Sequence, residues 1–323
     1  RSGTQEERKV FSVNYDLSEF QYPSSDGKHT IHAELYTPKV GTPRAIVQLS
    51  HGMVDFVGRY RYLADALCGA GFVFAGNCHL GHGKSAGGDE DLGIFSEDGG
   101  IDFVLRDLHA MNKYLRAAYP NLPLVLLGHS MGSFIARVYT ERYPHDISAL
   151  IIHGTGGPNP ALPLAKAIGA TVEFFKGPRH RSALITNLAF GSYNKKFDKS
   201  EGPDAWLTRD TAVIKEYEEE KLSHFRFTVA GYRDLFRLVG LSNAKKWFNE
   251  FPKHLPTLIV SGTMDPVGAY GKGPAYVYKH LLLAGCNNVT LKLYDGARHE
   301  LHNETNRDEV FRDIIEWVES AVL

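Results

Sequence analysis

Short apolar runs alternate along the chain with longer segments in which apolar residues recur every three to four positions. Leu124–Leu127 and Ala149–Ile152 are continuous apolar runs, which is the pattern of strands buried on both faces of a parallel sheet. Further strands are predicted at Ile31–Thr37, Ala45–Leu49, Phe72–Ala75, Thr257–Ser261 and Val289–Tyr294. Helical periodicity predicts helices at Tyr60–Ala70, Ile101–Ala118, Phe134–Tyr143, Ala275–Ala284 and Glu309–Val322. This alternation indicates an α/β protein with a mostly parallel, doubly wound sheet.

The alternation stops between residues 154 and 251. A turn cluster opens this stretch, and helical patterns follow at Leu162–Phe175, Ser182–Ala189, Ala212–Glu219 and Gly231–Leu241. Because no strand pattern occurs there, we predict a helical cap, residues 154–251, inserted into a core formed by residues 10–153 and 252–323. Residues 1–9 are polar and charged, and we expect them to form a disordered tail outside the fold.

Composition narrows the functional classes. Apolar residues make up 43% of the 323 residues, which is enough for a sizeable core. The formal net charge of −1 argues against nucleic acid as a partner, because nucleic-acid binders usually carry a basic excess. The chain has three cysteines and no apolar run long enough to span a bilayer. An odd, sparse set of cysteines favours a reducing compartment, so we expect a cytoplasmic protein.

The pentapeptide G-x-S-x-G occurs twice, around Ser130 and around Ser85. A hydroxyl nucleophile is displayed best on a sharp turn between a strand and a helix, where small neighbours let the backbone bend. Ser130 directly follows a predicted strand and precedes an amphipathic helix, whereas Ser85 lies in a glycine-rich loop with no helix pattern after it. This context favours Ser130 as the nucleophile over the alternative of an ordinary helix N-cap.

A serine hydroxyl needs a base, and the base needs an acid that orients it. Around a strand-to-helix nucleophile these partners follow in the order serine, acid, histidine. Asp265 comes just after the predicted strand Thr257–Ser261, and His299 comes just after Val289–Tyr294. We therefore predict Ser130, Asp265 and His299 as the catalytic residues. Asp295 is the alternative acid, and His302 is the alternative base.

Acyl transfer also needs hydrogen-bond donors for the developing oxyanion. The backbone N–H groups of Met131, directly after the nucleophile, and of Met53, after the strand Ala45–Leu49, are the candidates. No metal or cofactor is expected. The segment from His299 to His302 lacks the H-E-x-x-H zinc spacing, and Gly81–Ser85 lacks the first glycine of a phosphate loop.

Five motifs together resemble the monoacylglycerol lipase and lysophospholipase group of serine α/β-hydrolases, in the serine aminopeptidase-like hydrolase family. In chain order they are His51-Gly52-Met53 with Gly58-Arg59-Tyr60, Gly81-His82-Gly83-Lys84-Ser85, Gly128-His129-Ser130-Met131-Gly132, Gly262-Thr263-Met264-Asp265-Pro266, and Gly296-Ala297-Arg298-His299-Glu300-Leu301-His302-Asn303-Glu304. The similarity covers roughly Gln48 to Val318 and is weakest in the cap. One departure is visible, because the family usually has an aspartate and often an arginine where this chain has His79 and Leu80.

The resemblance implies the α/β-hydrolase fold, the same triad and oxyanion donors, and a membrane-facing cap over an acyl tunnel. We predict hydrolysis of lipid or other small carboxylic esters with hydrophobic acyl chains, through an acyl-enzyme. An aminopeptidase or amidase on the same scaffold is the alternative, and its substrate amine would require acids from the cap: Glu173, Glu201, Glu216 and Glu218. A ligand receptor that keeps the fold without turnover is the alternative from another class.

The predicted helix Leu162–Phe175 is apolar on more than one face, and its charged residues are Lys166 and Glu173. We expect the cap to contact a membrane surface peripherally and substrate to be bound by Leu162, Leu164, Ile168, Phe174 and Phe175. The alternative is that this segment is a buried core helix of the cap.

Overall fold

Eight strands form one sheet in the computed structural model, which describes residues 13–323. The strands are β1 (Tyr15–Pro23), β2 (Thr30–Pro38), β3 (Ala45–Ser50), β4 (Phe72–Asn77), β5 (Leu124–His129), β6 (Ala149–His153), β7 (Thr257–Gly262) and β8 (Val289–Tyr294). Their order is β1-β2-β4-β3-β5-β6-β7-β8. β1 pairs antiparallel with β2, and β2 with β4, whereas all other neighbours are parallel. The predicted mostly parallel sheet is confirmed. The expected tail, residues 1–9, lies outside the described residues.

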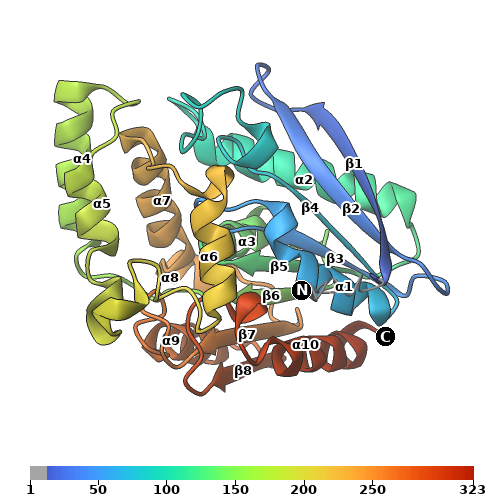
Figure 1. Ribbon diagram of the computed structural model, residues 1–323. Helices are drawn as coiled ribbons and strands as arrows, with labels where there is room; N and C mark the ends of the chain where they lie inside the picture. Colours follow the sequence, from blue (N-terminus) through green and yellow to red (C-terminus); the bar gives the residue numbers. More distant parts are fainter. Residues whose placement is uncertain (1–12) are drawn as a thin grey trace, which may run out of the picture.

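The central strands are apolar throughout because both of their faces are covered. Alternate side chains of β5 enter two different cores, with Leu124 and Leu126 on one side and Val125 and Leu127 on the other. One core is closed by α2 (Gly100–Ala118), α3 (Met131–Arg142) and α9 (Lys272–Leu283), and the other by α1 (Arg61–Gly69) and α10 (Arg307–Val322). Helices therefore cover the sheet on both faces (Figure 1).

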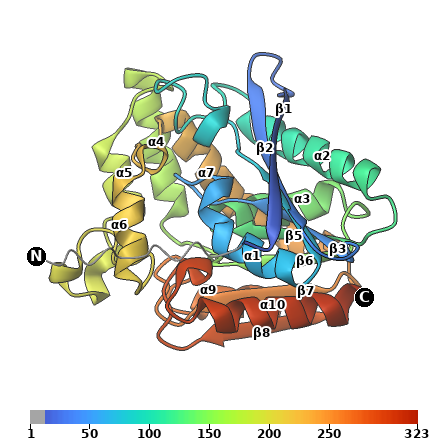
Figure 2. The same cartoon turned by 45° about the vertical axis from the view of Figure 1, so that its right-hand side comes forward.

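Between β6 and β7 the chain forms five α-helices, three short 3-10 helices and no strand. These are α4 (Leu162–Lys176), α5 (Ala183–Phe190), α6 (Thr211–Glu219), α7 (Val229–Ser242) and α8 (Lys245–Glu250). α7 packs against α3 and α2, so it ties the insertion to the body of the protein. α4 packs against α7 and α5. As a result α4 and α5 lie together at one side of the molecule, away from the helices that flank the sheet (Figures 1 and 2).

The parallel strands all end at the same edge of the sheet, and the loops that leave this edge carry the candidate residues. β3 runs into His51, β5 into Ser130, β7 into the loop of Asp265, and β8 into the loop of His299. In open α/β sheets, ligands bind beyond the carboxyl ends of the strands.

Candidate active site

Ser130 lies in the tight turn between β5 and α3, with φ of 53° and ψ of −119°. A Cβ atom added at Gly132 would lie 1.8 Å from the Ser50 carbonyl oxygen, and one at Gly128 would lie 2.4 Å from the Gly132 carbonyl oxygen. Both glycines are therefore required for the turn to pack against β3 and α3. The Ser130 N–H donates to the His153 carbonyl at 3.0 Å, which fixes the turn to the end of β6.

The candidate base and acid form a buried pair. Nδ1 of His299 lies 3.0 Å from both carboxylate oxygens of Asp265. Asp265 also accepts hydrogen bonds from the Val267 N–H at 2.8 Å and from the Ser261 hydroxyl at 3.3 Å. Ser130 and His299 line the same cavity, although no hydrogen bond joins their side chains among the described residues. Such bonds commonly tighten when substrate binds.

The alternative residues lie in different surroundings. The Ser85 hydroxyl is buried, donates to the Cys78 carbonyl at 2.8 Å and accepts the His32 N–H at 2.9 Å. Asp295 is exposed and accepts a hydrogen bond from Thr263 at 3.2 Å. His302 stacks on the Tyr60 ring at 4.2 Å. None of these three contacts the His299–Asp265 pair through a hydrogen bond.

Two backbone N–H groups beside Ser130 have no hydrogen-bond partner among the described residues, those of Met131 and Met53. Met131 is the first residue of α3, where a helix has no acceptor for its N–H. Gly52, Met53 and Met131 all line the cavity. The residues of both candidate donors therefore line the same cavity as Ser130.

His51 holds the peptide bond that carries the Met53 N–H. Nε2 of His51 accepts the His79 N–H at 2.9 Å, so Nδ1 carries the proton and donates to the Gly52 carbonyl at 2.8 Å. The peptide is planar and trans, so fixing this carbonyl turns the Met53 N–H to the opposite side. Burial lowers the pKa of His51, which keeps the ring in the neutral form that this arrangement requires.

His79 occupies the position where the family that this sequence resembles usually has an aspartate. Its Nε2 lies 3.0 Å from the Ser50 hydroxyl, and its ring lies 4.3 Å from the ring of His51. Burial, together with the nearby His51 and His82 rings, lowers the pKa of His79 well below its ordinary value. A neutral imidazole therefore stands where a carboxylate would be charged.

A buried ion-pair network lies beneath the site. Arg59 binds both carboxylate oxygens of Glu300 at 2.8 Å and contacts Asp55 at 3.1 Å. Burial alone would raise the pKa of Asp55 and Glu300. The Arg59 guanidinium and the other groups around them together more than offset burial, so both carboxyls have lowered pKa values. Tyr60 completes the network by donating to Asp55 at 2.6 Å. Because Glu300 follows His299, this network anchors the histidine loop.

The insertion between β6 and β7 also holds the histidine loop. The His299 N–H donates to the Trp206 carbonyl at 3.4 Å, and the Trp206 ring lies 5.1 Å from the His299 ring. Glu304 is fully buried, accepts the Arg298 N–H at 2.8 Å and pairs with Arg209 at 2.8 Å. Trp206 is a functional candidate that no sequence motif contains. Arg59 and Glu304 belong to two of the five motifs, but the sequence assigned them no role.

A cavity of about 870 Å³ opens from Ser130 into the insertion. Its apolar wall comes mainly from α4, α5 and α7, with Leu162, Leu164, Ala165, Ile168, Leu188, Ala189, Phe190, Leu235, Phe236 and Val239. Its polar groups include Arg59, Glu300 and Asp204. Asp204 forms no ion pair with a basic side chain within residues 13–323, and burial raises its pKa.

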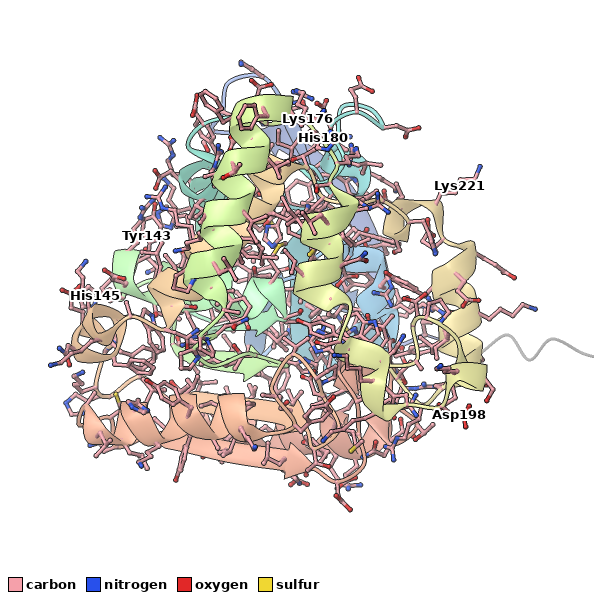
Figure 3. The ribbon with its side chains drawn as sticks, turned by 90° about the vertical axis from the view of Figure 1, so that its left-hand side faces the viewer. Tyr143, His145, Lys176, His180, Asp198 and Lys221 are labelled. Carbon is pink, nitrogen blue, oxygen red and sulfur yellow. The ribbon has the colours of Figure 1, made fainter. Side chains whose placement is uncertain are left out.

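The five apolar residues expected to bind substrate divide into two groups. Leu162, Leu164 and Ile168 line the cavity, whereas Phe174 and Phe175 do not and are 83% and 74% exposed. The only buried residue of α4 is Gly169, so the alternative that α4 is a buried core helix is wrong. In Figure 3 α4 and α5 face the viewer, with Lys176 near the end of α4. Within residues 13–323 no helix has both the length and the apolar character to cross a bilayer.

The chain is similar to known proteins over most of its length. A family model described as serine aminopeptidase, S33, matches residues 41–306. The monoglyceride lipase of Homo sapiens is 29% identical over 308 residues, which cover 92% of this chain and 91% of that protein. The monoacylglycerol lipase of Mycolicibacterium smegmatis is 28% identical over 314 residues, covering 95% and 99%. A thermostable carboxyl esterase from Bacillus coagulans, solved in complex with glycerol, has a TM-score of 0.89 at 29% identity, covering 95% and 99%.

Proposed function

Because this chain belongs to the serine aminopeptidase, S33, family, we propose that it is a serine hydrolase of carboxylic esters with hydrophobic acyl chains. The observation that carries the proposal is the buried His299–Asp265 pair, which shares with the strained Ser130 turn a cavity that has a long apolar wall. The relatives described as monoglyceride lipases and as a carboxyl esterase support this bond and substrate class.

In the proposed mechanism the Ser130 oxygen attacks the ester carbonyl carbon while His299 takes the hydroxyl proton. Asp265, bonded to Nδ1, keeps the ring oriented and stabilises the imidazolium. The negative charge that develops on the carbonyl oxygen is stabilised by the N–H groups of Met53 and Met131. The alcohol leaves with the proton from His299. Water then donates a proton to His299 and attacks the acyl-enzyme carbonyl. The bond to the Ser130 oxygen breaks, the acid leaves, and His299 returns the proton to that oxygen.

Labelling and turnover test the nucleophile. Ser130→Ala should lower ester turnover by about three orders of magnitude or more, as loss of a triad member does. A fluorophosphonate probe should label a Ser130 peptide in the native chain. Ser85→Ala is the matched control, and it should keep the native kcat if the variant folds. Labelling at Ser85, or native activity in Ser130→Ala, would contradict the proposal.

The aminopeptidase alternative needs an acid that faces a substrate amine. Three of the four glutamates expected for that role pair with arginines instead, Glu173 with Arg233, Glu201 with Arg298, and Glu216 with Arg61. None of the four expected glutamates lines the cavity.

Asp204 lines the cavity and pairs with no basic side chain within residues 13–323, so it is the carboxylate to test as a ligand for a substrate amine. A panel of monoacylglycerols, lysophospholipids, short aryl esters and aminoacyl amides separates the two reactions. We expect hydrolysis of the lipid esters. Preferred hydrolysis of aminoacyl amides, abolished in Asp204→Asn, would replace the ester proposal.

We also propose that the insertion, residues 154–251, is a cap that contacts a membrane surface. Leu164 and Leu188 line the cavity and are 64% and 52% exposed, so they mark its rim on α4 and α5. Phe174 and Phe175 extend the apolar surface along α4, and exposed apolar patches commonly mark membrane contact. The paired substitution of Phe174 and Phe175 by Asp should weaken co-sedimentation with phospholipid vesicles and leave hydrolysis of a dissolved acetyl ester unchanged. Equal co-sedimentation of both proteins would refute this contact.

A further inference from the structure

Three buried histidines meet behind the Ser130 turn, each from a different segment. His129 ends β5, His153 ends β6, and His302 lies in the short 3-10 helix Leu301–Asn303. Nδ1 of His129 lies 2.7 Å from Nδ1 of His153. The His302 ring lies 4.8 Å from the ring of His129 and 5.4 Å from that of His153. Each residue contributes one nitrogen to a set whose members all lie within 4.8 Å of one another.

Several nitrogens of this cluster lack protein partners. Nε2 of His153 and both ring nitrogens of His302 have no hydrogen-bond partner among the described residues. Leaving buried polar atoms unpaired is costly, so the three unpaired nitrogens point to a ligand at the cluster. A neutral imidazole has one lone pair, so the two nitrogens of His302 supply one lone pair and one N–H. Burial lowers the pKa of all three rings, that of His302 to about 4. At neutral pH each ring is therefore an uncharged imidazole. The hydrogen bond between Nδ1 of His129 and Nδ1 of His153 uses one of the three lone pairs, so a bound metal must replace that bond.

We propose that His129, His153 and His302 bind a divalent transition metal, with Zn²⁺ as the reference ion, and that its binding inhibits the hydrolase. Imidazole suits Zn²⁺, which takes three histidines and one further ligand at about 2.0–2.1 Å. Tetrahedral coordination at that distance separates the nitrogens by about 3.3 Å, so side-chain rotations must close the widest pair by about 1.5 Å.

The surroundings favour a cation and give it a path. His129 borders the substrate cavity, which provides an entrance from solvent. Asp55 and Glu300 carry two negative charges next to His302, and Arg59 neutralises one of them. At His302 the two carboxylates together act more strongly than Arg59, so the field at this ring favours a bound dication.

Inhibition follows from the position of the cluster, and this part rests on the proposed function. The His129 ring lies 4.8 Å from the ring of His299. During catalysis His299 must become an imidazolium, and a dication behind His129 opposes that charge. His129 also precedes Ser130, so a metal bond to its ring pulls on the turn that displays the nucleophile. We expect ester turnover to fall at least tenfold when the site is filled.

Direct measurement of metal binding to the full chain tests the three-histidine site independently of enzyme activity. Zn²⁺ competition against a chromogenic chelator should show one tight site, and chelation by EDTA should restore full turnover. Co²⁺ in its place should produce the intense visible bands of tetrahedral coordination in the native chain. The Ser130→Ala protein should bind equally well, so a failure of the proposed ester chemistry leaves the binding result readable.

His153→Asn should abolish this binding and also the zinc sensitivity, measured relative to the variant's own turnover in metal-free buffer. The matched control is His29→Asn, because His29 lies 2.5 Å from Asp26 and 3.5 Å from Asp91 in a histidine–carboxylate group outside the cluster. This control should keep the tight site. Unchanged binding in His153→Asn, or only octahedral Co²⁺ bands in the native chain, would overturn the site. Tight binding with unchanged turnover would overturn the inhibition.

Discussion

At the scale of single residues, the backbone at Ser130 carries strain that its neighbours must offset. A non-glycine residue at φ of 53° and ψ of −119° lies outside the broadly allowed regions, at a cost of about 1–3 kcal/mol. The hydrogen bond from Ser130 N–H to His153 and the close packing of Gly128 and Gly132 hold the turn in place. This backbone conformation exposes the Ser130 side chain to the cavity, where its oxygen can reach a substrate.

The acid can be tested with a matched pair of aspartates, because Asp265 and Asp295 come from neighbouring loops after β7 and β8. Asp265→Asn should lower kcat by about three to four orders of magnitude, because the amide no longer stabilises the correct His299 tautomer and its imidazolium. Asp295→Asn should leave kcat nearly unchanged, since Asp295 is exposed and bonded to Thr263. Steady-state kinetics on a short aryl ester measure both, and comparable losses in the two variants would contradict the assignment.

The residues that could be inferred from sequence were those whose position along the chain is diagnostic. Ser130, Asp265 and His299 each follow a strand, and their order is typical of the strand-to-helix nucleophile. Arg59 and Glu300 are 241 positions apart, so no local pattern signals their bidentate pair. The same holds for His129, His153 and His302, which come from three segments and are brought together by the sheet and the histidine loop.

At the scale of elements, α4 has some residues that line the cavity and others that are exposed to solvent. Ile168 lines the cavity, and Phe175 on the same helix is 74% exposed. Ile168→Gln should raise KM for long-chain monoacylglycerols about tenfold or more, because a lost buried contact costs about 1–3 kcal/mol. It should barely change KM for an acetyl ester. Phe175→Gln is the control and should leave KM for monomeric substrate unchanged. A similar rise for both ester lengths in Ile168→Gln would remove the support for an acyl-binding role.

The elements that sequence reasoning missed are those with weak periodic signals. β1 is an edge strand with no buried residue, so it has no apolar run to mark it. α8 has six residues, which is too short for its periodicity to stand out. By contrast, the strands buried on both faces and the long helices α2 and α10 were predicted to within a few residues, because packing against the sheet dictates their composition.

At the scale of the whole molecule, a second histidine group lies beyond the carboxyl edge of the sheet. His51, His79 and His82 are all buried, and rings of His51 and His79 lie 4.3 Å apart. Burial lowers the pKa of all three, that of His82 to about 3. The folded protein therefore carries these rings uncharged under conditions in which an exposed imidazole would take up a proton.

This burial predicts acid sensitivity of the fold, and His82 is the residue that tests it. In the unfolded chain an ordinary histidine pKa is near ~6.5, so above that pH neither state binds a proton on His82 and stability does not depend on it. Below that pH the unfolded chain binds a proton that the folded chain refuses until about pH 3. The free energy of unfolding then falls by up to about 1.4 kcal/mol per pH unit for each such histidine.

His82→Phe removes one such group and keeps an aromatic ring beside Phe95 and Phe227, which lie 5.8 Å and 5.3 Å from the native imidazole. Urea unfolding at pH 7, 6 and 5 should therefore show a smaller loss of stability on acidification in this variant than in the native chain. His145→Gln is the control, because His145 is exposed at the surface and water reaches its ring in both states (Figure 3). If the native chain and His82→Phe lose stability in parallel, the His82 ring does not resist protonation in the folded state.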